Sequence, residues 1–382
     1  MTGDYYFNIS TNNVDYVFNI KRNITVITGY SGTGKTTLID ILESYLSSIS
    51  NDILPEVVID TNAKWDIINS YDLSKLPLFD TNDVIYFMDE KYSRLFNNGN
   101  FINCMKNSGN YFVVITRKNN KSFPIMPYSF KEIYGIETRM VDNRYINTFK
   151  SIYPLYKPII RPDVLIIEDS KSGFDFFSQV ADKYNFICKT SYGNSNIFTV
   201  LNEYIESNYI GNILIIADGS AFGSYIKKIY ELYRKYDNIY LWLPESFEYL
   251  LLCSGMFRNN TTLQEILKSP INYIDCSKYI SWERFFTKLL VYITKECPNE
   301  YNEKKNNSTA ADENYRFNYV NKFREQSTNG ICINTCYIEN CCHKDCKDCQ
   351  MFFCGDKIDD ILGDKADIFK NNELKVPKLN LF

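Results

Sequence analysis

The residues best suited to chemistry form a glycine-rich loop near the start of the chain. The stretch Gly29-Tyr30-Ser31-Gly32-Thr33-Gly34-Lys35-Thr36 satisfies the phosphate-loop pattern G-x4-G-K-[ST]. Its glycines let backbone N–H groups turn inward around phosphate oxygens, where a Cβ atom would collide. Lys35 adds positive charge, and the Thr36 hydroxyl is placed to hold Mg²⁺. We therefore predict a nucleotide site formed by Gly29, Ser31, Gly32, Thr33, Gly34, Lys35, Thr36 and Thr37.

Two carboxylates that close a hydrophobic run are expected to complete this site. "VIYFMDE" is typical of a buried strand ending in Asp89 and Glu90. We expect Asp89 to reach the magnesium ion through water and Glu90 to orient or deprotonate the attacking water. The next predicted strand, "VVITR", ends in Thr116 and Arg117, which are candidate sensors of the γ-phosphate. No N-K-x-D motif for reading a guanine base is evident, so ATP is expected rather than GTP. The spacing of loop and acids leaves a small kinase or a nucleotide switch open.

A second set of acids follows strands later in the chain. Glu168 and Asp169 follow "VLII", Asp218 follows "ILIIA", and Glu245 and Glu248 follow "YLWLP". The carboxyl ends of the strands are where active sites form in open α/β sheets. Carboxylates gathered there would repel each other unless a divalent cation joined them. The sequence therefore predicts a second metal site, which includes Glu168, Asp218 and Glu248.

The segments around these acids resemble the four strand ends of a TOPRIM domain. They are "LIIEDSKSGFDFF", "TSYGNSNIF", "LIIADGSAFG" and "LPESFEYLL". That fold serves topoisomerases, primases and the overcoming-lysogenization-defect nucleases. The resemblance implies that Glu168 is a general base or acid and that Asp218 binds Mg²⁺. Ser220 stands where the family has a second Asp, and a neutral hydroxyl is a poor ligand. Either Glu245 or Glu248 compensates, or the domain is a non-catalytic relic.

Most of residues 1–290 also resembles a group of uncharacterised P-loop ATP-binding proteins from Firmicutes. The shared stretches are "RNITVITGYSGTGKTTL", "PYSFKEIYGI", "EDSKSG" and "ADGSAFG". This group carries no established activity to transfer. The pairing of a P-loop ATPase with a TOPRIM-like domain is similar, at the level of folds, to bacterial anti-phage systems in which the ATPase controls a nuclease.

The elements that must position these residues follow from hydrophobic periodicity. The first residues predict two short antiparallel strands that lead into a buried strand at Ile24–Thr28. Apolar residues at helical spacing predict an amphipathic helix over Thr36–Ser48. "EVVID", "DVIYFMDE" and "NYFVVITR" are candidate buried strands. Alternating strands and helices of this kind indicate a parallel sheet covered on both faces.

We predict an α/β protein organised in five parts. A P-loop NTPase domain with a parallel sheet spans 1–150, and a proline-rich linker spans 151–162. A smaller TOPRIM-like α/β domain spans 163–255. A helical segment with a polar loop near 298–315 spans 256–330, and a Cys-rich segment and tail span 331–382.

The Cys-rich segment, "CINTCYIENCCHKDCKDCQMFFC", is a candidate zinc site. Soft ligands spaced as C-x3-C and C-x2-C suit tetrahedral Zn²⁺, which could replace the core that this stretch lacks. The candidates exceed one site, so two ions bind or some thiols are spare. An iron–sulfur cluster and an unligated, reduced tail are the alternatives. The candidate ligands are Cys332, Cys336, Cys341, Cys342, His343, Cys346, Cys349 and Cys354.

Composition narrows the class of protein. The formal net charge is −4 and the pI about 5.4. The chain therefore lacks the overall basic charge typical of general nucleic-acid binding, although these values do not exclude a local basic groove. No apolar run approaches the roughly 20 residues of a membrane span. "MTGDYYFNIS" lacks the pattern of a signal peptide. We expect a cytoplasmic protein whose 12 cysteines are reduced or bind metal. The oligomeric state stays open.

Two functions compete at this stage. In the first, Mg²⁺-dependent ATP hydrolysis controls the TOPRIM-like domain, whose output is metal-dependent cleavage of nucleic acid. In the second, the protein is a regulatory module in which the phosphate loop is a switch. The second domain then binds nucleic acid or a protein without cutting. Glu90, Glu168 and Asp218 favour the enzyme, whereas Ser220 and the acidic pI favour the module.

Overall fold

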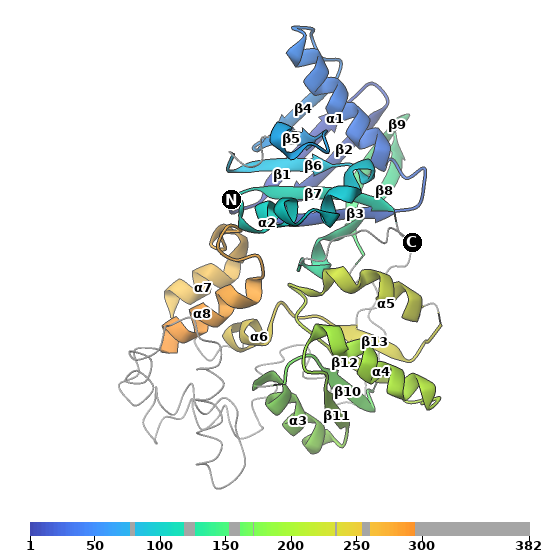
Figure 1. The fold of residues 1–382 in the computed structure, drawn as a ribbon, viewed down its shortest axis with the longest axis vertical. Helices are drawn as coiled ribbons and strands as arrows, with labels where there is room; N and C mark the ends of the chain where they lie inside the picture. Colours follow the sequence, from blue (N-terminus) through green and yellow to red (C-terminus); the bar gives the residue numbers. More distant parts are fainter. Residues whose placement is uncertain are drawn as a thin grey trace.

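The computed structural model describes residues 1–76, 81–117, 127–152, 161–170, 172–233, 235–253 and 260–294. The predicted Cys-rich segment, the polar loop near 298–315 and most of the predicted linker 151–162 lie outside these residues. The described part has two sheets, the larger formed by the N-terminal residues and the smaller by the residues after 161 (Figure 1).

The first sheet has nine strands in the order β4-β1-β2-β9-β8-β3-β7-β6-β5. Five neighbouring strands, β8, β3, β7, β6 and β5, run parallel to one another. In contrast, β1 pairs antiparallel with β2 and β4, and β8 pairs antiparallel with β9. The sheet is therefore mixed. Its strands are β1 (Tyr5–Ser10), β2 (Val14–Ile20), β3 (Ile24–Gly29), β4 (Val58–Thr61), β5 (Lys64–Ile68), β6 (Val84–Met88), β7 (Tyr111–Arg117), β8 (Ile133–Val141) and β9 (Arg144–Ser151).

Helices cover both faces of the first sheet. Helix α1 (Lys35–Ser50) buries Leu38, Ile39 and Leu42 in one apolar cluster with β3 and β6. On the other face, α2 (Gly99–Asn107) packs with the 3₁₀ helix η3 (Glu90–Asn97) against a second cluster. The amphipathic helix is confirmed, although it begins one residue before Thr36 and ends at Ser50 rather than Ser48.

Two predictions for the first sheet need correction, and one hairpin was missed. The sheet is not parallel throughout, because β1 pairs antiparallel with β2 and β4, and β8 pairs antiparallel with β9. "EVVID" is not a buried strand, because β4 lies at the sheet edge antiparallel to β1 and Val58 is 65% exposed. The hairpin of β8 and β9 was not predicted. Its turn residues Asp142 and Asn143 both have positive φ, the conformation that matches strand twist in a two-residue hairpin. The exposed end of this hairpin mixes polar residues with the exposed apolar residues Met140, Val141 and Tyr145, so the sequence shows no clear alternation there.

The second sheet has four parallel strands in the order β11-β10-β12-β13. Strands β10 and β12 are buried on both faces, as their runs VLII and ILII predict. The chain passes from β10 to β11 on one side and then to β12 on the other, so β10 and β12 flank a topological switch point. The elements are β10 (Val164–Ile167), α3 (Ser172–Tyr184), β11 (Ile187–Thr190), α4 (Ile197–Glu206), β12 (Ile213–Ile216), α5 (Ile226–Tyr233), β13 (Ile239–Trp242) and α6 (Phe247–Cys253).

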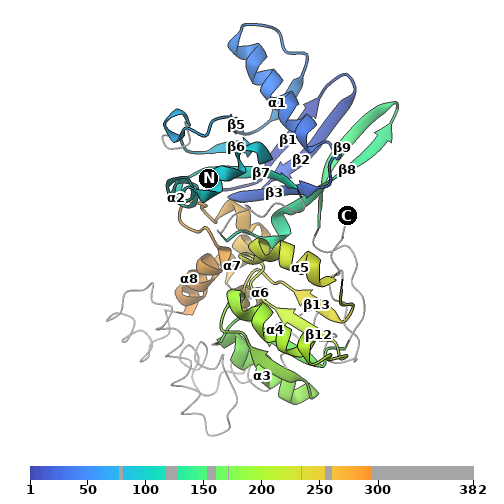
Figure 2. The same cartoon turned by 45° about the vertical axis from the view of Figure 1, so that its right-hand side comes forward.

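The described residues after 260 are largely helical, as predicted. Helix α7 (Thr261–Lys268) precedes α8 (Trp282–Thr294), and Phe286 and Leu290 of α8 join the apolar cluster of α6. Figures 1 and 2 place α7 and α8 beside both units. The backbone N–H of Cys276 donates to the carbonyl of Met1, so this segment also contacts the start of the chain.

One apolar cluster spans the two units. A single apolar cluster contains Phe130 and Ile133 of the first unit together with Phe222 and Leu243 of the second. The short 3₁₀ helix η4 (Phe130–Glu132) lies at this junction. The Phe130 N–H donates to the carbonyl of Gly219 at 2.9 Å.

Gly223 lies at a close backbone contact between the two units. Its N–H donates to the carbonyl of Tyr128 at 2.9 Å. A Cβ atom at this position would lie 2.4 Å from the Tyr128 ring, so only glycine fits here without displacing the junction. The stretches "PYSFKEIYG" and "ADGSAFG" therefore pack against each other.

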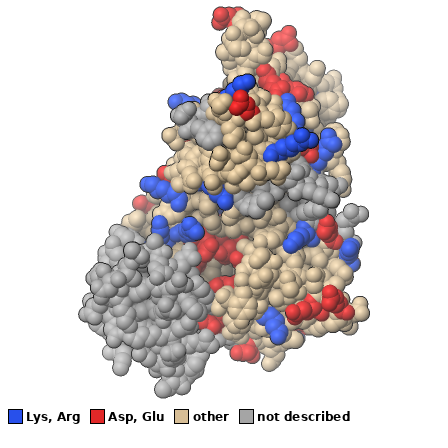
Figure 3. All heavy atoms as spheres, viewed as in Figure 1, with Lys and Arg blue, Asp and Glu red and all other residues tan. Residues whose placement is uncertain are grey.

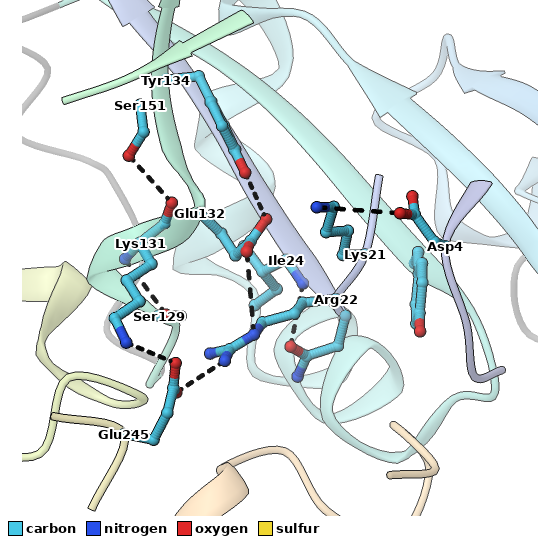
Figure 4. Close-up of polar contacts among 12 residues, drawn as sticks. Asp4, Lys21, Arg22, Ile24, Ser129, Lys131, Glu132, Tyr134, Ser151 and Glu245 are labelled. Carbon is cyan, nitrogen blue, oxygen red and sulfur yellow. Dashed lines mark hydrogen bonds and ion pairs between the residues drawn. The ribbon is translucent and has the colours of Figure 1, made fainter. Parts of the chain in front are cut away.

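A buried ionic cluster completes the junction (Figure 4). Arg22 lies 2.7 Å from Glu245 and 3.9 Å from Glu132, and Lys131 lies 2.9 Å from Glu245. The Arg22 guanidinium also lies over the Trp282 ring, 3.4 Å from its centroid. Burial raises the pKa of Glu132, with Arg22 opposing it. Burial also acts to raise the pKa of Glu245, but Arg22 and Lys131 together hold it below its ordinary value. We name these five residues the Arg22 cluster.

Replacing Arg22 with Met should lower the free energy of unfolding by roughly 3–5 kcal/mol, because Glu245 and Glu132 would lose their buried counter-charge. Urea unfolding of the full chain measures this. Lys21→Met is the matched control, since Lys21 is exposed and only 3.8 Å from Asp4. Its effect should stay within about 0.5 kcal/mol. Equal losses in the two variants would contradict a buried role for Arg22.

Candidate functional site

The glycine-rich loop connects β3 to α1 at the carboxyl end of the first sheet. Gly32 and Gly34 have φ of +83° and +84°, which favours glycine at both positions. A Cβ atom on Gly34 would also lie 3.0 Å from the Tyr16 hydroxyl oxygen, and that hydroxyl donates to the Gly34 carbonyl at 2.7 Å. The first turn of α1 contains no acidic residue. The partial positive charge of the helix dipole at this N-terminus is therefore not neutralised by a side chain of that turn.

Lys35 is buried beneath this loop. Its ammonium group donates to the carbonyls of Gly29 at 3.0 Å and Tyr30 at 2.6 Å, and to the Thr33 hydroxyl at 2.9 Å. Burial lowers the pKa of Lys35, while nearby Glu90 opposes this and Arg117 adds to it. Ser31, Thr36 and Thr37 are exposed. The structure thus presents a cation and several hydroxyl groups around one helix N-terminus.

The acidic strand end lies at the same edge of the sheet. Strand β7 lies between β3 and β6, and the parallel register pairs Gly29 with Arg117. Glu90 follows β6, and its carboxylate lies 2.9 Å from the Arg117 side chain. Asp89 is 3.9 Å from Lys91. The structure therefore brings together Lys35, Glu90 and Arg117, three residues of the predicted nucleotide site. Thr116 is buried, and its hydroxyl donates to the Arg117 carbonyl.

The second candidate site is an acidic pocket of about 200 Å³ at the switch point of the second sheet. Figure 3 shows Asp and Glu side chains gathered around a hollow beside this unit. Glu168 and Asp169 come from the end of β10 and Asp218 from the end of β12. The lining residues are Glu168, Asp169, Ser170, Tyr192, Gly193, Asp218, Phe247, Glu248 and Glu283.

Glu168 lies between two strand ends. Its carboxylate accepts a hydrogen bond from the Asp218 N–H at 2.8 Å. Burial raises its pKa to about 7, and the neighbouring charges of Glu283 and Asp169 add to this rise. The Asp169 carboxylate accepts from the N–H of Gly173, near the start of α3, at 2.7 Å. The ionised form of Glu168 is therefore disfavoured. A cation bound nearby would offset this cost.

The structure distinguishes the two acids proposed to compensate for Ser220. Glu245 lies outside the pocket lining, because Arg22 and Lys131 bind its carboxylate. Glu248, three residues later in the first turn of α6, lines the pocket. Ser220 is buried, with its hydroxyl oxygen 3.2 Å from that of Ser281. It also lies outside the lining.

Sequence reasoning missed Glu283. It belongs to the first turn of α8, about 60 residues beyond Asp218, and no strand precedes it within "SWERFF". An acid at a helix start is an ordinary feature of surface helices, so only tertiary packing could assign it to the pocket. The pocket therefore draws acids from two strands and two helices.

The donor atoms of this pocket are carboxylate oxygens, which suit hard cations such as Mg²⁺ and Mn²⁺. Within the described ranges, however, no three His, Cys, Asp or Glu side chains are close enough together to hold a metal ion as they stand. The predicted ligands Cys332 to Cys354 lie outside those ranges. A cation in the pocket would have to draw together the carboxylates that follow β10 and β12 and those of α6 and α8.

Comparisons with protein-family models, curated proteins and solved structures find no match for this chain. Among the described helices, none combines the length and the apolar character of a membrane span.

Glu168 should make the stability of the protein depend on pH. Its pKa is raised on folding, so the stabilisation is present at low pH and is lost as pH rises through about 7. In EDTA, the unfolding temperature of the wild type should fall more between pH 5.5 and 8 than that of Glu168→Gln. Glu203→Gln, an exposed acid on α4, should follow the wild type. Parallel profiles for wild type and Glu168→Gln would contradict the burial of this charge.

Proposed function

We propose that this protein is a Mg²⁺-dependent ATPase whose nucleotide state controls a metal-dependent nuclease. The observation that carries the first half is the meeting of Lys35, Glu90 and Arg117 at one sheet edge beside the glycine-rich loop. The loop, the acid-bearing strand and the intervening strand β7 support a P-loop NTPase domain. The order β11-β10-β12-β13, with acids at the switch point, supports a TOPRIM-like domain.

The contacts around the loop are compatible with phosphate binding. Lys35 donates to neutral acceptors of the loop itself, whereas a phosphate would place a negative charge opposite the ammonium group. Arg117 is 71% exposed, and its exposed pair with Glu90 contributes roughly 1 kcal/mol or less. Little energy therefore opposes a turn of Arg117 toward a γ-phosphate. Thr36 and Asp89 would hold Mg²⁺, and Glu90 would orient the attacking water.

In the second unit, Glu168, Asp218 and Glu248 would hold a divalent cation, which supplies charge stabilisation at a scissile phosphate. The TOPRIM resemblance gives Glu168 the role of general base or acid beside this cation. Glu283 extends this set from the C-terminal helix. Nucleic acid is thus the proposed substrate class.

One observation favours the non-cleaving alternative. Ser220 is buried against Ser281, so the position that the TOPRIM resemblance gives to a second Asp supplies no ligand. In that version the acidic pocket is a binding or regulatory site, and ATP drives a switch.

Substituting Glu90→Gln should slow ATP turnover by about 10²- to 10⁴-fold and leave ATP bound, because the water loses its base. Lys35→Ala should abolish binding itself. Phosphate release and a filter-binding assay with labelled ATP separate the two effects. Glu56→Gln, an exposed acid after α1, should behave as the wild type. Unchanged turnover in Glu90→Gln would remove Glu90 from the mechanism.

Cleavage is tested with plasmid DNA, single-stranded DNA and tRNA, each with Mg²⁺ or Mn²⁺ and with or without ATP. Cleavage should be lost in Glu168→Ala, and its dependence on ATP should be lost in Lys35→Ala. Glu203→Ala, exposed on α4, controls for the loss of one surface charge. An absence of cleavage under every condition would favour the ATP-driven switch.

A further inference from the structure

The Arg22 cluster lies at the junction of the two units. Figure 4 shows Arg22 pointing toward Glu132 of its own unit and Glu245 of the second. Both carboxylates and the guanidinium are buried, with exposed fractions of 8% or less. Buried charges of this kind cannot separate without leaving one of them uncompensated. The cluster is therefore expected to move as one body.

On the N-terminal side, the cluster is attached to the glycine-rich loop through the sheet. Arg22 lies two residues before the strand β3, whose last residue, Gly29, begins the loop. Lys131 and Glu132 immediately precede β8, which pairs with β3 through Val26–Ile133. A shift of the loop that moves β3 therefore reaches the cluster within a single strand length.

On the other side, the cluster is attached to the acidic pocket. Glu245 is three residues before Glu248, and Trp282, which stacks on Arg22, is directly before Glu283. The neighbouring bond from Phe130 N–H to the Gly219 carbonyl adjoins Asp218. Each of these three pocket acids is thus within three residues of a contact with the N-terminal unit. Glu168 and Asp169, in contrast, follow β10 in the interior of the second sheet.

The pocket therefore has one wall on the second sheet and another on α6 and α8, and the second wall is held by Arg22. We propose that Arg22 is a positioning residue that sets the spacing of these walls. Nucleotide at the glycine-rich loop then changes the affinity of the acidic pocket for a divalent cation. This inference rests on the proposed function and names its regulation. It also explains how acids that do not yet converge on one point could be brought together.

The first test measures Mn²⁺ binding to the nucleotide-free full chain by electron paramagnetic resonance. Glu168→Ala should abolish binding at the pocket. Arg22→Lys keeps the charge but shortens the side chain, and Glu245→Gln keeps the shape but removes the charge. Each should weaken Mn²⁺ binding at least about fivefold, the lower range of coupling between sites. Lys21→Gln, the exposed neighbour, should not. Unfolding temperatures measured in parallel show that the variants are folded.

The second test follows Trp282 itself. The chain has three tryptophans, so Trp65→Phe with Trp242→Phe leaves Trp282 as the single reporter. A non-hydrolysable ATP analogue with Mg²⁺ should shift its emission. The emission shift should disappear in Lys35→Ala, because this variant is expected not to bind nucleotide. It should become smaller in Arg22→Lys and in Glu245→Gln, which are expected to bind nucleotide as the wild type does.

The outcomes separate the inference from the function beneath it. Nucleotide binding without any change at Trp282, or Mn²⁺ affinity unaltered by Arg22→Lys, overturns the inference and leaves the ATPase proposal standing. Absence of nucleotide binding overturns the proposed function and the inference with it. If Glu168→Ala binds Mn²⁺ as tightly as the wild type does, the acidic pocket is not the Mn²⁺ site. It is then removed from the proposed function and from the inference.

Discussion

The buried guanidinium of Arg22 is the constraint on which the arrangement of the two sheets depends. A buried cation is tolerated only with counter-charges and further contacts around it. Here the first unit supplies Arg22, Lys131 and Glu132, and the second unit supplies Glu245. The aromatic face of Trp282 adds a contact from a third element, α8. Neither unit can satisfy these charges alone, so the polar cluster specifies one docking geometry where an apolar junction would allow several.

Both candidate sites follow from the same property of parallel strands, whose carboxyl ends meet at one edge. At the first edge, β3, β7 and β6 end in a loop with a buried lysine, an arginine and two acids. At the second edge, β10 and β12 end in acids alone. The first therefore suits an anion and the second a cation. These opposite charges support the ligands that we propose, a nucleotide at the first edge and a divalent metal at the second.

The acidic pocket departs from a site built on one sheet. Ser220 turns into the protein toward Ser281, and the acids that extend the pocket beyond β10 and β12 come from α6 and α8. Such a site depends on elements that also contact the N-terminal unit. This dependence distinguishes it from a pocket whose ligands all follow strands of one rigid sheet, and it makes control by the first unit physically reasonable.

The sequence by itself determined much of the local structure. The glycine-rich loop, the buried strands β3, β6, β10 and β12, and the helix α1 follow from residue spacing, because glycine conformation and burial periodicity act over a few residues. It also identified Lys35, Glu90 and Arg117, whose convergence needs only that parallel strands end together. The zinc prediction lies outside the described residues and stays a prediction.

Only the tertiary structure decided which acids share a pocket. Glu245 and Glu248 look equivalent in the sequence, yet the first, just before α6, binds Arg22 and the second, in the first turn of α6, lines the pocket. Glu283 joins from a distant helix, and β4 and the β8–β9 hairpin take places that no local pattern indicated. These outcomes depend on contacts between residues far apart in the chain. Burial and charge pairing are set by the whole fold, and no short stretch of sequence contains that information.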